Sequence, residues 1–515
     1  MAAPYNAAAD LLARGLAAAG PDKTAFVDGA RALTYGELAQ RARAAAAGLR
    51  ARGVRPEQRV VLILHDTIDF PVMFLGAMLA GAVPVPVNTL LSMTDYAYVL
   101  ADARAVAVVV SAALLGKVVP ALPSGALVIV AGDAGEGAPP APVETLAFDA
   151  LLAAGAAAAE LPAPPTCADD VAFWLYSSGS TGVPKGTMHL HSNLLATAET
   201  YGAQVLGIAS DDVVFSAAKL FFAYGLGNAL TFPMSVGATS VLLPARPTPA
   251  AVIAVLRRFQ PTIFFGVPTL YASLLADPVE RPEGASPALR RCVSAGEALP
   301  RHLGEHWEAR VGVEILDGIG STEMLHIFLS NRPGQVRYGT SGWPVPGYEV
   351  ELRDERGAPA AADAEGALWV RGPSAAAGYW NQRQRSLSTF HGPWTQTGDR
   401  YRRDEAGAYV YGGRNDDMLK VGGIWVAPFE VESALAAHPL VLEAAVVGHA
   451  DAEGLIKPKA FVVLQDASQA GDATAALLTE FIKDQLAPYK YPRWIEFVAE
   501  LPKTATGKIQ RFRLR

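Results

Sequence analysis

The chain has 515 residues, of which 51% are hydrophobic and 18% are charged, and its formal net charge is −7. A chain of this length exceeds one ordinary hydrophobic core, so we expect two or more domains. The net charge is mild for the length and indicates neither nucleic acid nor an anionic membrane as a partner.

The two cysteines, Cys167 and Cys292, form no Cys-x-x-Cys pair and belong to no Cys/His cluster. This pattern argues against a disulfide framework and structural zinc, and it fits a reducing cytoplasm. Asp10 and Arg14 interrupt the Ala/Leu-rich N-terminal stretch, so we predict no signal peptide. The longest apolar run, at 72–87, is broken by two prolines and is too short for a membrane span.

Residues 1–170 alternate Ala/Leu-rich helical patterns with short apolar runs such as 60–64 and 106–110. This alternation predicts a layered α/β domain. We interpret the Ala-rich stretch 151–164 as a surface connection, since alanine is frequent throughout and indicates composition bias more than disorder.

A second α/β series follows, with predicted strands at 213–215, 239–243 and 262–265 and a predicted helix at 249–259. Repeated strand–helix units imply mostly parallel sheets. Between residues 339 and 370, Gly/Pro turns separate short alternating segments at 348–352 and 367–370, which predicts a small antiparallel or barrel-like part.

A compact unit of about 100 residues begins after Gly412-Gly413, and we expect it to be a separate, mobile domain. The predicted fold is therefore a multi-domain α/β protein. A large N-terminal domain, 1–413, holds layered α/β sheets and the barrel-like part. A small α+β domain, 414–515, completes the chain.

The stretch Tyr176 to Gly186 has the composition of a polyphosphate-binding loop. It follows a predicted buried strand at 171–175 and contains three glycines, four Ser/Thr hydroxyls and one lysine. Glycines let backbone N–H groups approach an anion, and hydroxyls and an ammonium add donors. The common P-loop requires Gly-Lys-Ser/Thr, whereas here Lys185 follows Pro184. We therefore predict ATP bound by a different loop; a Gly/Ser surface linker is the alternative.

Two further polar stretches are predicted to be loops at the carboxyl ends of strands, where α/β sheets bind ligands. One is Ser294 to Glu297, and the other is Asp317 to Glu323, which follows an apolar run at 313–316. Each signal is weak alone, because Thr322 could simply begin a helix and Glu323 could simply cap one.

Three stretches near the predicted boundary and the C-terminus carry charges. The Asp399 carboxylate in Thr397-Gly398-Asp399 could accept two ribose hydroxyls, although an ordinary turn is equally compatible. Arg414, Asp416 and Lys420 flank the boundary and could form a solvated linker. Lys508 follows a Thr-Gly turn, which alone is typical of a polar tail.

The order of these stretches resembles the acyl-adenylate-forming ligases, a superfamily that contains acyl-CoA synthetases, nonribosomal peptide adenylation domains and beetle luciferase. The resemblance spans nearly the whole chain. Within the superfamily, Lys219 to Asn228 (KLFFAYGLGN) and Glu323 to Phe328 (EMLHIF) are similar to the benzoate–CoA ligases.

The resemblance implies binding sites for ATP and Mg²⁺. Thr322 would contact the α-phosphate, and Glu323 would hold Mg²⁺ through a hard oxygen. The β- and γ-phosphates would lie against Ser177, Ser178, Gly179, Ser180, Thr181, Gly182 and Lys185. Adenine would be lined by Ser294, Ala295, Gly296, Glu297, Asp317, Gly318 and Ile319, and the ribose would contact Asp399 and Arg414.

The resemblance also implies an apolar slot for an aromatic acid, lined by Ala223, Tyr224, Gly320, His326 and Ile327. Family members rotate the C-terminal domain about a hinge that corresponds to Asp416. Lys508 would then serve adenylation, and Lys420 would serve thioester formation. Coenzyme A would pass Gly422 and Gly423, with Tyr489 and Lys490 near its nucleotide.

The implied activity converts benzoate, or a closely related substituted benzoate, into its CoA thioester with release of AMP and pyrophosphate. A ligase for another aryl or short carboxylic acid is one alternative. An amino-acid adenylation domain would need an acidic group near the substrate, and Phe221 to Tyr224 offers none. A silent nucleotide-binding regulator is disfavoured by the presence of both Lys420 and Lys508.

The sequence leaves the oligomeric state open, with a homodimer among the alternatives. Lys508 also resembles the site at which lysine acylation regulates this superfamily, and acylation would remove its charge. Acylating and deacylating enzymes are therefore expected partners, beside the small-molecule substrates.

Overall fold

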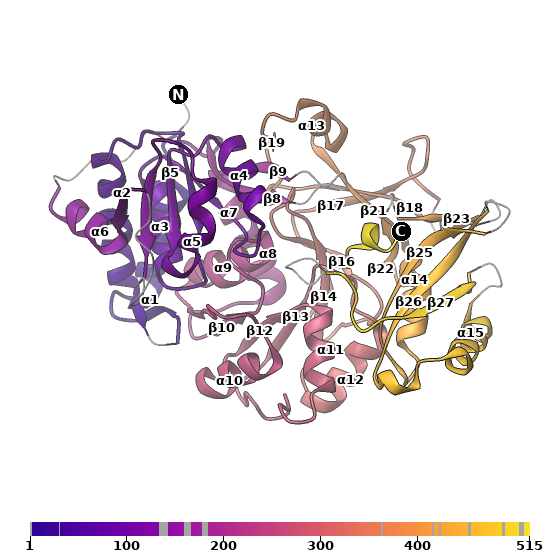
Figure 1. Ribbon diagram of the computed structural model, residues 1–515. Helices are drawn as coiled ribbons and strands as arrows, with labels where there is room; N and C mark the ends of the chain where they lie inside the picture. The colour runs from indigo at the N-terminus through magenta and orange to yellow at the C-terminus, as the bar shows by residue number, and fades with distance from the viewer. Residues whose placement is uncertain are drawn as a thin grey trace.

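A computed structural model describes residues 3–29, 31–132, 143–158, 166–177, 184–361, 364–414, 417–421, 424–451, 455–486, 490–503 and 509–515. The N-terminal α/β part lies on one side, and the C-terminal strands and helices lie on the other (Figure 1). Within the described residues, no helix is long and apolar enough to cross a membrane.

A five-stranded parallel sheet forms the centre of the N-terminal part. Its strands, in order, are β4 (Val83–Pro86), β3 (Arg59–Ile63), β5 (Ala107–Ser111), β6 (Leu127–Ala131) and β7 (Thr145–Ala147). The middle strands are apolar along their length because helices cover the sheet, as parallel sheets require. The strands predicted at 60–64 and 106–110 are confirmed as β3 and β5, shifted by one residue.

A nine-stranded sheet forms the second α/β layer. Its order is β16 (Trp343–Pro344), β15 (Ile327–Ser330), β14 (Ile315–Gly320), β13 (Arg291–Ser294), β12 (Ile263–Gly266), β10 (Val213–Ser216), β11 (Thr239–Val241), β1 (Thr24–Val27) and β2 (Ala32–Thr34). The strands from β14 through β13, β12, β10 and β11 to β1 pair in parallel, as predicted. Strands β15, β16 and β2 pair antiparallel at the two edges.

Helices connect and cover these sheets. Before residue 200 they are α1 (Ala7–Ala19), α2 (Tyr35–Ala51), α3 (Asp69–Leu79), α4 (Met93–Asp102), α5 (Leu115–Val118), α6 (Phe148–Ala156) and α7 (His191–Thr197), with 3₁₀ turns η1 (Ala112–Leu114) and η2 (Val119–Ala121). They continue as the π-helical η3 (Ala198–Leu206), α8 (Ala223–Leu226), the π-helical η4 (Gly227–Thr231), α9 (Phe232–Val236), α10 (Pro249–Phe259), α11 (Pro268–Ala276) and α12 (Arg301–Val311). Helix α10 has the predicted bounds, since Thr248 caps its first turn and Pro249 occupies N1.

The interpretation of residues 151–164 as a surface connection is wrong for its first part. Residues up to Ala156 belong to α6, which packs against α2. A Cβ added at Gly155 would lie 1.8 Å from the Ala44 carbonyl oxygen, so the backbones touch there. Small residues allow this close approach. The alanines and glycine that were interpreted as composition bias belong, up to Ala156, to a helix that packs against α2. Residues 159–164 lie outside the described part.

The strand before the predicted phosphate loop continues into a β-hairpin. Strand β8 (Val171–Ser177) pairs antiparallel with β9 (Lys185–Leu190), and β19 (Gly378–Tyr379) pairs on the other side of β9. Strand β8 also packs beside β4, which attaches the hairpin to the first parallel sheet. The predicted strand 171–175 is therefore confirmed and longer than expected.

The predicted antiparallel part is confirmed as a five-stranded sheet. Its strands are β17 (Glu349–Arg353), β18 (Gly366–Arg371), β20 (Phe390–His391), β21 (Trp394–Arg403) and β22 (Tyr409–Arg414), and every pairing is antiparallel. Helix α13 (Arg383–Thr389) precedes β20.

The C-terminal part contains mixed α and β structure. Its strands are β23 (Leu419–Val421), β24 (Ile424–Val426), β25 (Val441–Ala450), β26 (Ile456–Leu464) and β27 (Trp494–Phe497), and its helices are α14 (Pro428–Ala436), η5 (Ala467–Gln469), α15 (Asp472–Gln485) and η6 (Arg511–Arg513). A separate apolar cluster lies between the β25–β26–β27 sheet and helices α14 and α15. This core of its own agrees with the expectation of a separate α+β unit.

Candidate functional site

Lys185 lies at the first position of β9, directly opposite the end of β8. The hairpin register pairs Ser177 with Lys185 and Tyr176 with Gly186. Two contacts hold the ends of the hairpin to helix α4: the Tyr176 hydroxyl donates to Asp102 at 2.6 Å, and the Tyr98 hydroxyl donates to the Pro184 carbonyl at 3.2 Å. The predicted phosphate residues Ser178, Gly179, Ser180, Thr181 and Gly182 lie outside the described part.

Glu323 lies 2.9 Å from the Lys185 ammonium, so the structure joins the two predicted phosphate and metal stretches. The Tyr379 hydroxyl donates to Glu323 Oε1 at 2.7 Å and accepts from Lys185 Nζ at 2.8 Å. Burial would raise the pKa of Glu323, but the Lys185 ammonium and the Tyr379 hydroxyl outweigh it and hold the pKa below its ordinary value. Glu323 is therefore an anion at neutral pH.

Thr322 and Glu323 lie in a turn between two strands. The Ser321 hydroxyl accepts from the Met324 backbone N–H at 3.2 Å, and Leu325 has a φ of 63°. The next element is strand β15, so the alternative readings of Thr322 as a helix start and Glu323 as a helix cap are wrong. The turn presents a buried carboxylate instead.

The prediction that Asp317 to Gly320 form a loop is wrong, because these residues belong to strand β14. Strand β14 pairs in parallel with β13 up to Asp317 and then pairs antiparallel with β15 through Gly318, Ile319 and Gly320. The chain remains extended past the end of its parallel partner because β15 folds back onto it. The predicted loop begins only at Ser321.

The predicted adenine residues lie side by side on adjacent strands. Ser294 is the last residue of β13 and is in register with Asp317 on β14. The Leu299 backbone N–H donates to Asp317 Oδ2 at 3.3 Å, and burial raises the pKa of the Asp317 carboxyl well above its ordinary value. Gly296 has a φ of 98°, a conformation that favours glycine.

The two predicted ribose residues also meet. Asp399 on β21 is in register with Arg414 on β22, and the Asp399 carboxylate lies 3.6 Å from the guanidinium. The Thr397 hydroxyl accepts from the Asp399 backbone N–H at 3.1 Å, and the φ of Gly398 is 81°. The Thr-Gly-Asp stretch is therefore a bend in the long strand β21 that orients a carboxylate.

Four of the five residues predicted for the acid slot belong to α8, β14 and β15, and the fifth, His326, lies in the turn directly before β15. The Tyr224 and His326 rings lie 5.6 Å apart, and Tyr224 also packs edge-on against Phe265. A Cβ added at Gly320 would lie 2.5 Å from the His326 carbonyl oxygen, so only glycine fits there. Burial lowers the pKa of His326 to about 3, which leaves the imidazole neutral at pH 7. The surroundings are suited to an uncharged ring.

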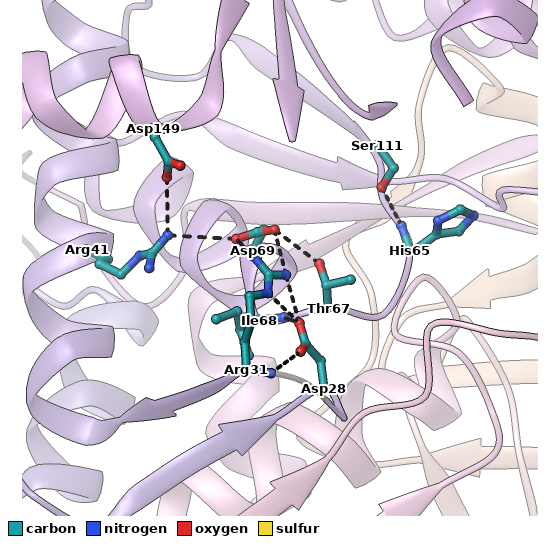
Figure 2. Close-up of polar contacts among 9 residues, drawn as sticks. All are labelled: Asp28, Arg31, Arg41, His65, Thr67, Ile68, Asp69, Ser111 and Asp149. Atoms are coloured by element: carbon teal, nitrogen blue, oxygen red, sulfur yellow. Dashed lines mark hydrogen bonds and ion pairs between the residues drawn. The ribbon is translucent and has the colours of Figure 1, made fainter. Parts of the chain in front are cut away.

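A buried polar cluster supports the segment before α8. The Leu220 backbone N–H donates to both Asp66 carboxylate oxygens at 3.3 Å, and Asp66 lies in the connection between β3 and α3. Figure 2 shows how this connection is held: the His65 N–H donates to the Ser111 hydroxyl, and the Ile68 N–H donates to Asp28.

Asp69 completes the cluster in Figure 2. Its nearly inaccessible carboxylate pairs with Arg31 at 3.0 Å and lies 3.8 Å from Arg41. Arg31 also pairs with Asp28 at 2.7 Å. These paired charges fix the β3–α3 connection, and through Asp66 they fix the segment before α8 that is predicted to bind the acid.

The C-terminal residues predicted for coenzyme A and for the two lysine roles are only partly described. Lys420 lies on β23 in register with Trp425, although its side chain is outside the described part. Lys490 donates to both Glu430 carboxylate oxygens, at 2.6 and 2.7 Å. The residues outside the described part are Asp416, Gly422, Gly423, Tyr489 and Lys508. Ile509 is described, and its N–H donates to Glu297 at 3.1 Å.

Sequence reasoning missed Tyr379 and Asn228. Tyr379 joins Lys185 to Glu323, and the Asn228 carboxamide oxygen lies 3.0 Å from His326 Nε2. No local pattern around Tyr379 suggests a phosphate or metal site, because its position depends on the β19–β9 pairing. Asn228 lies within the stretch that resembles the benzoate–CoA ligases. As a polar residue in an apolar run, it could have been recognised as a candidate for a buried hydrogen bond.

Comparisons with known proteins place the chain in a family. Residues 14–380 match the AMP-binding enzymes, and residues 430–508 match the C-terminal domain of AMP-binding enzymes. The benzoate–CoA ligase of Thauera aromatica is 57% identical, covering 99% of this chain and 96% of that protein. The 4-hydroxybenzoate–CoA/benzoate–CoA ligase of Rhodopseudomonas palustris is 51% identical, covering 99% and 94%.

Solved structures give the same result. A benzoate CoA ligase from Burkholderia xenovorans superposes with a TM-score of 0.91 at 54% identity, covering 99% of this chain and all of that one. The anthranilate CoA ligase AuaEII in complex with anthranoyl-AMP has a TM-score of 0.92 at 42% identity, covering 99% and 97%. The resemblance to the benzoate–CoA ligases is thus confirmed over the full chain, and the chain belongs to the AMP-binding, acyl-adenylate-forming enzymes.

Proposed function

We propose that the protein is a benzoate–CoA ligase that works in two steps. First, a benzoate oxygen attacks the α-phosphorus of ATP, and the bond to pyrophosphate breaks to give benzoyl-AMP. Second, the thiol sulfur of coenzyme A loses its proton and attacks the acyl carbonyl, and AMP leaves. The observation that carries the proposal is full-length similarity to benzoate–CoA ligases. The neutral His326 imidazole beside the Tyr224 ring supports an uncharged site for the benzoate ring.

The first step builds negative charge on phosphoryl oxygens, which cations and N–H donors must stabilise. Lys185 supplies an ammonium beside the hairpin end, and Thr322 lies next to Glu323 in the turn that carries the carboxylate. We assign Lys185 to the β/γ-phosphates and Thr322 to the α-phosphate.

The donor set fits Mg²⁺ at Glu323. No cluster of three or more His, Cys, Asp or Glu that could hold a metal ion occurs among the described residues. Mg²⁺ commonly binds through one or two carboxylates plus substrate phosphates and water, so a single anionic Glu323 is sufficient. Bound there with ATP, Mg²⁺ would neutralise phosphate charge.

Adenine and ribose recognition follow from the strand pairings. The adenine residues are proposed on β13, on β14 and in the turn after β13, with Asp399 and Arg414 at the ribose. The benzoate ring is proposed to fill the slot between Tyr224, Ile327 and Gly320. Its carboxylate then points toward the turn that carries Thr322.

For the second step, we propose that the domain 414–515 rotates about Asp416 relative to the domain 1–413. Lys508 serves the first orientation, and Lys420 with Gly422 and Gly423 serves the second. Glycines admit the narrow pantetheine arm, and Tyr489 and Lys490 are proposed near the coenzyme's nucleotide. We place the enzyme in the cytoplasm, because its two cysteines are unpaired thiols.

The direct test supplies purified protein with Mg·ATP, coenzyme A and benzoate. The expected products are benzoyl-CoA, AMP and pyrophosphate. A panel of substituted benzoates, read by AMP release, gives the ring preference. Much faster use of acetate and medium-chain fatty acids than of any aromatic acid would contradict the aromatic assignment. Absence of any acid-dependent pyrophosphate exchange would indicate a silent nucleotide-binding protein.

A further inference from the structure

One buried tyrosine joins the two charged groups assigned to ATP. The Lys185 ammonium, the Tyr379 hydroxyl and Glu323 Oε1 form a triangle with sides of 2.8, 2.7 and 2.9 Å. The Lys185 and Glu323 side chains are only 19% and 14% exposed, so water screens the pair weakly. The Lys185 ammonium also lies 4.3 Å from the centre of the Tyr379 ring.

Strand geometry explains why Tyr379 reaches both groups. Tyr379 on β19 is in register with Thr187 on β9, and Lys185 is two residues from Thr187. Residues two apart on a strand share a face, and side chains on paired strands interact diagonally as well as directly. The Tyr379 side chain therefore lies diagonally across from Lys185 on one face of the sheet.

The segment before Tyr379 is fixed to the turn that carries Glu323. The Ala376 N–H donates to the Glu323 backbone carbonyl at 2.8 Å, and the Ser374 hydroxyl donates to the Met324 carbonyl at 2.6 Å. One segment thus contacts the carboxylate turn at Ala376 and strand β9 at Tyr379. It sets the separation between Glu323 and Lys185.

Tyr379 itself has little freedom to move. The side chain is 4% exposed and packs 5.3 Å from the Phe390 ring. The Ser386 hydroxyl accepts from the Tyr379 N–H at 3.0 Å. A lysine side chain, by contrast, is a flexible stem that ends in a compact charge. In the Lys185–Glu323 ion pair, Lys185 is therefore the side chain that is able to turn toward a triphosphate.

We propose that Tyr379 is a positioning residue for the ATP half-reaction, because its hydroxyl bridges Lys185 and Glu323 in the ATP-free enzyme and continues to orient Glu323 when Lys185 turns to the triphosphate. The inference rests on the proposed function of Lys185 and Glu323. The Lys185–Glu323 pair satisfies both buried charges before ATP binds. A largely buried Glu323 carboxylate without hydrogen-bond donors would destabilise the enzyme. The Tyr379 hydroxyl still donates to Glu323 when Lys185 turns away, so this destabilisation is avoided.

The test compares Tyr379→Phe with the control Tyr338→Phe. Phenylalanine keeps the ring contacts of Tyr379 and removes only the hydroxyl. Tyr338 matches it because its hydroxyl also donates to a carboxylate, Glu308 on α12 at 2.8 Å, and because neither residue is assigned to ATP, Mg²⁺ or benzoate. In Tyr379→Phe, benzoate-dependent pyrophosphate exchange should fall about tenfold or more, as loss of a hydrogen bond to a charged group implies.

Conversion of supplied benzoyl-AMP and coenzyme A to benzoyl-CoA should stay within about twofold of the unsubstituted enzyme, because that step needs neither pyrophosphate contacts nor Glu323. The Tyr338→Phe enzyme should match the unsubstituted enzyme in both reactions. Equal loss of both half-reactions in folded Tyr379→Phe, or unchanged exchange, would overturn the positioning role.

A binding measurement separates this inference from the activity. Calorimetry with α,β-methylene-ATP, which cannot release pyrophosphate, gives the dissociation constant with and without Mg²⁺. The tightening caused by Mg²⁺ should shrink about fivefold or more in Tyr379→Phe and not in Tyr338→Phe. Equal tightening in both variants would overturn the inference. If the unsubstituted enzyme activated no acid, the proposed function would fail, and this measurement would still decide the role of Tyr379.

Discussion

Ala223 occupies the first position of α8, directly before Tyr224, and we propose that its small side chain leaves space for the substrate ring. Nearby space is already taken: a Cβ added at Gly227 would lie 2.5 Å from His326 Cδ2. The His326 ring thus leaves no space for a side chain at Gly227, on the side of the proposed slot where His326 lies.

Substituting Ala223→Leu should sharply reduce the use of benzoate. The added carbons would occupy ring space, and differences of this size in apolar pockets are worth about 1–3 kcal/mol, roughly 10–200-fold in kcat/KM. The dissociation constant for ATP should stay unchanged. Steady-state kinetics with benzoate and calorimetry with ATP check both outcomes.

Ala254→Leu is the matched control, because Ala254 is exposed on α10. That variant should keep the kinetics of the unsubstituted enzyme. Unchanged benzoate kinetics in Ala223→Leu would remove Ala223 from the slot.

Lys508 and Lys420 should act in different half-reactions. Removing one electrostatic donor from a transition state typically costs about 10²–10³ in rate. Lys508→Ala should nearly abolish benzoate-dependent pyrophosphate exchange but still convert supplied benzoyl-AMP and coenzyme A. Lys420→Ala should show the reverse. Both partial reactions are measured on the same protein preparations.

Lys483→Ala serves as the control, because Lys483 is a surface residue paired with Glu480 on the outer side of α15. It should change neither reaction. Acylation of Lys508 removes the same charge as the alanine substitution, so the modified enzyme should behave like Lys508→Ala. Normal benzoyl-AMP formation by Lys508→Ala would contradict both the catalytic and the regulatory assignment.

At the scale of single residues, the sequence indicated the charged side chains but not the tyrosine that joins two of them. Residue type and the family resemblance singled out Lys185, Glu323, Asp399 and Arg414, and the structure pairs Lys185 with Glu323 and Asp399 with Arg414. Tyr379 was not identifiable, because a tyrosine beside a glycine has no distinctive chemistry. Its role depends on a strand pairing that joins distant parts of the chain.

At the scale of elements, apolar periodicity located the strands and α10, but small residues were misleading. Alanine and glycine in α6 were interpreted as surface composition, whereas they allow α6 to touch α2. Strand β14 was predicted to end too early, because Gly318 and Gly320 were interpreted as turn residues. Both glycines instead allow the returning chain to pack closely. An added Cβ would lie 2.7 Å from the Leu329 carbonyl oxygen at Gly318 and 2.5 Å from the His326 carbonyl oxygen at Gly320.

Gly155→Ala should therefore destabilise the protein. The new methyl group would overlap the Ala44 carbonyl oxygen, and overpacking of this kind costs about 1–3 kcal/mol in the free energy of unfolding. Urea denaturation followed by circular dichroism measures the change. Benzoate kinetics of the folded enzyme should not change, because α6 contributes no residue to the slot.

Gly116→Ala is the matched control. Gly116 lies in α5, and an added Cβ would meet nothing within 4 Å. That substitution should leave stability unchanged or increase it slightly, since alanine restricts the unfolded chain. A loss of stability as large in Gly116→Ala as in Gly155→Ala would contradict the packing explanation.

At the scale of the whole molecule, the C-terminal part has its own apolar core, and its described residues contact the larger part at β22 and at the loop after β13. Tyr411 on β22 packs edge-on against Phe429 on α14, with ring centres 5.1 Å apart. The C-terminal segment also reaches the adenine loop through the Ile509–Glu297 hydrogen bond. Such an arrangement is compatible with rotation of one part against the other.

Asp416→Pro should separate the half-reactions if the chain rotates at that residue. Proline fixes φ and resists the backbone change that rotation requires. The variant should form benzoyl-AMP but hardly transfer the acyl group to coenzyme A. Single-turnover measurement of both steps checks this expectation.

Asp472→Pro is the matched control, because Asp472 is the first residue of α15, a position that tolerates proline. Both half-reactions should be preserved in that variant. Equal loss of the two reactions in folded Asp416→Pro would assign a general structural role to Asp416.

The hydrogen bond between Ile509 and Glu297 has a thermodynamic consequence. Glu297 accepts this hydrogen bond from the C-terminal segment, and on the proposed assignment the same residue also contacts adenine. Binding linkage is reciprocal: if the docked segment raises affinity for the nucleotide, the nucleotide must favour docking by the same factor. The free energy by which the nucleotide then stabilises docking opposes departure of the segment, and departure is required for the proposed second half-reaction. If Lys185 binds the β- and γ-phosphates as proposed, release of pyrophosphate removes those contacts and lowers the free energy needed for the segment to leave.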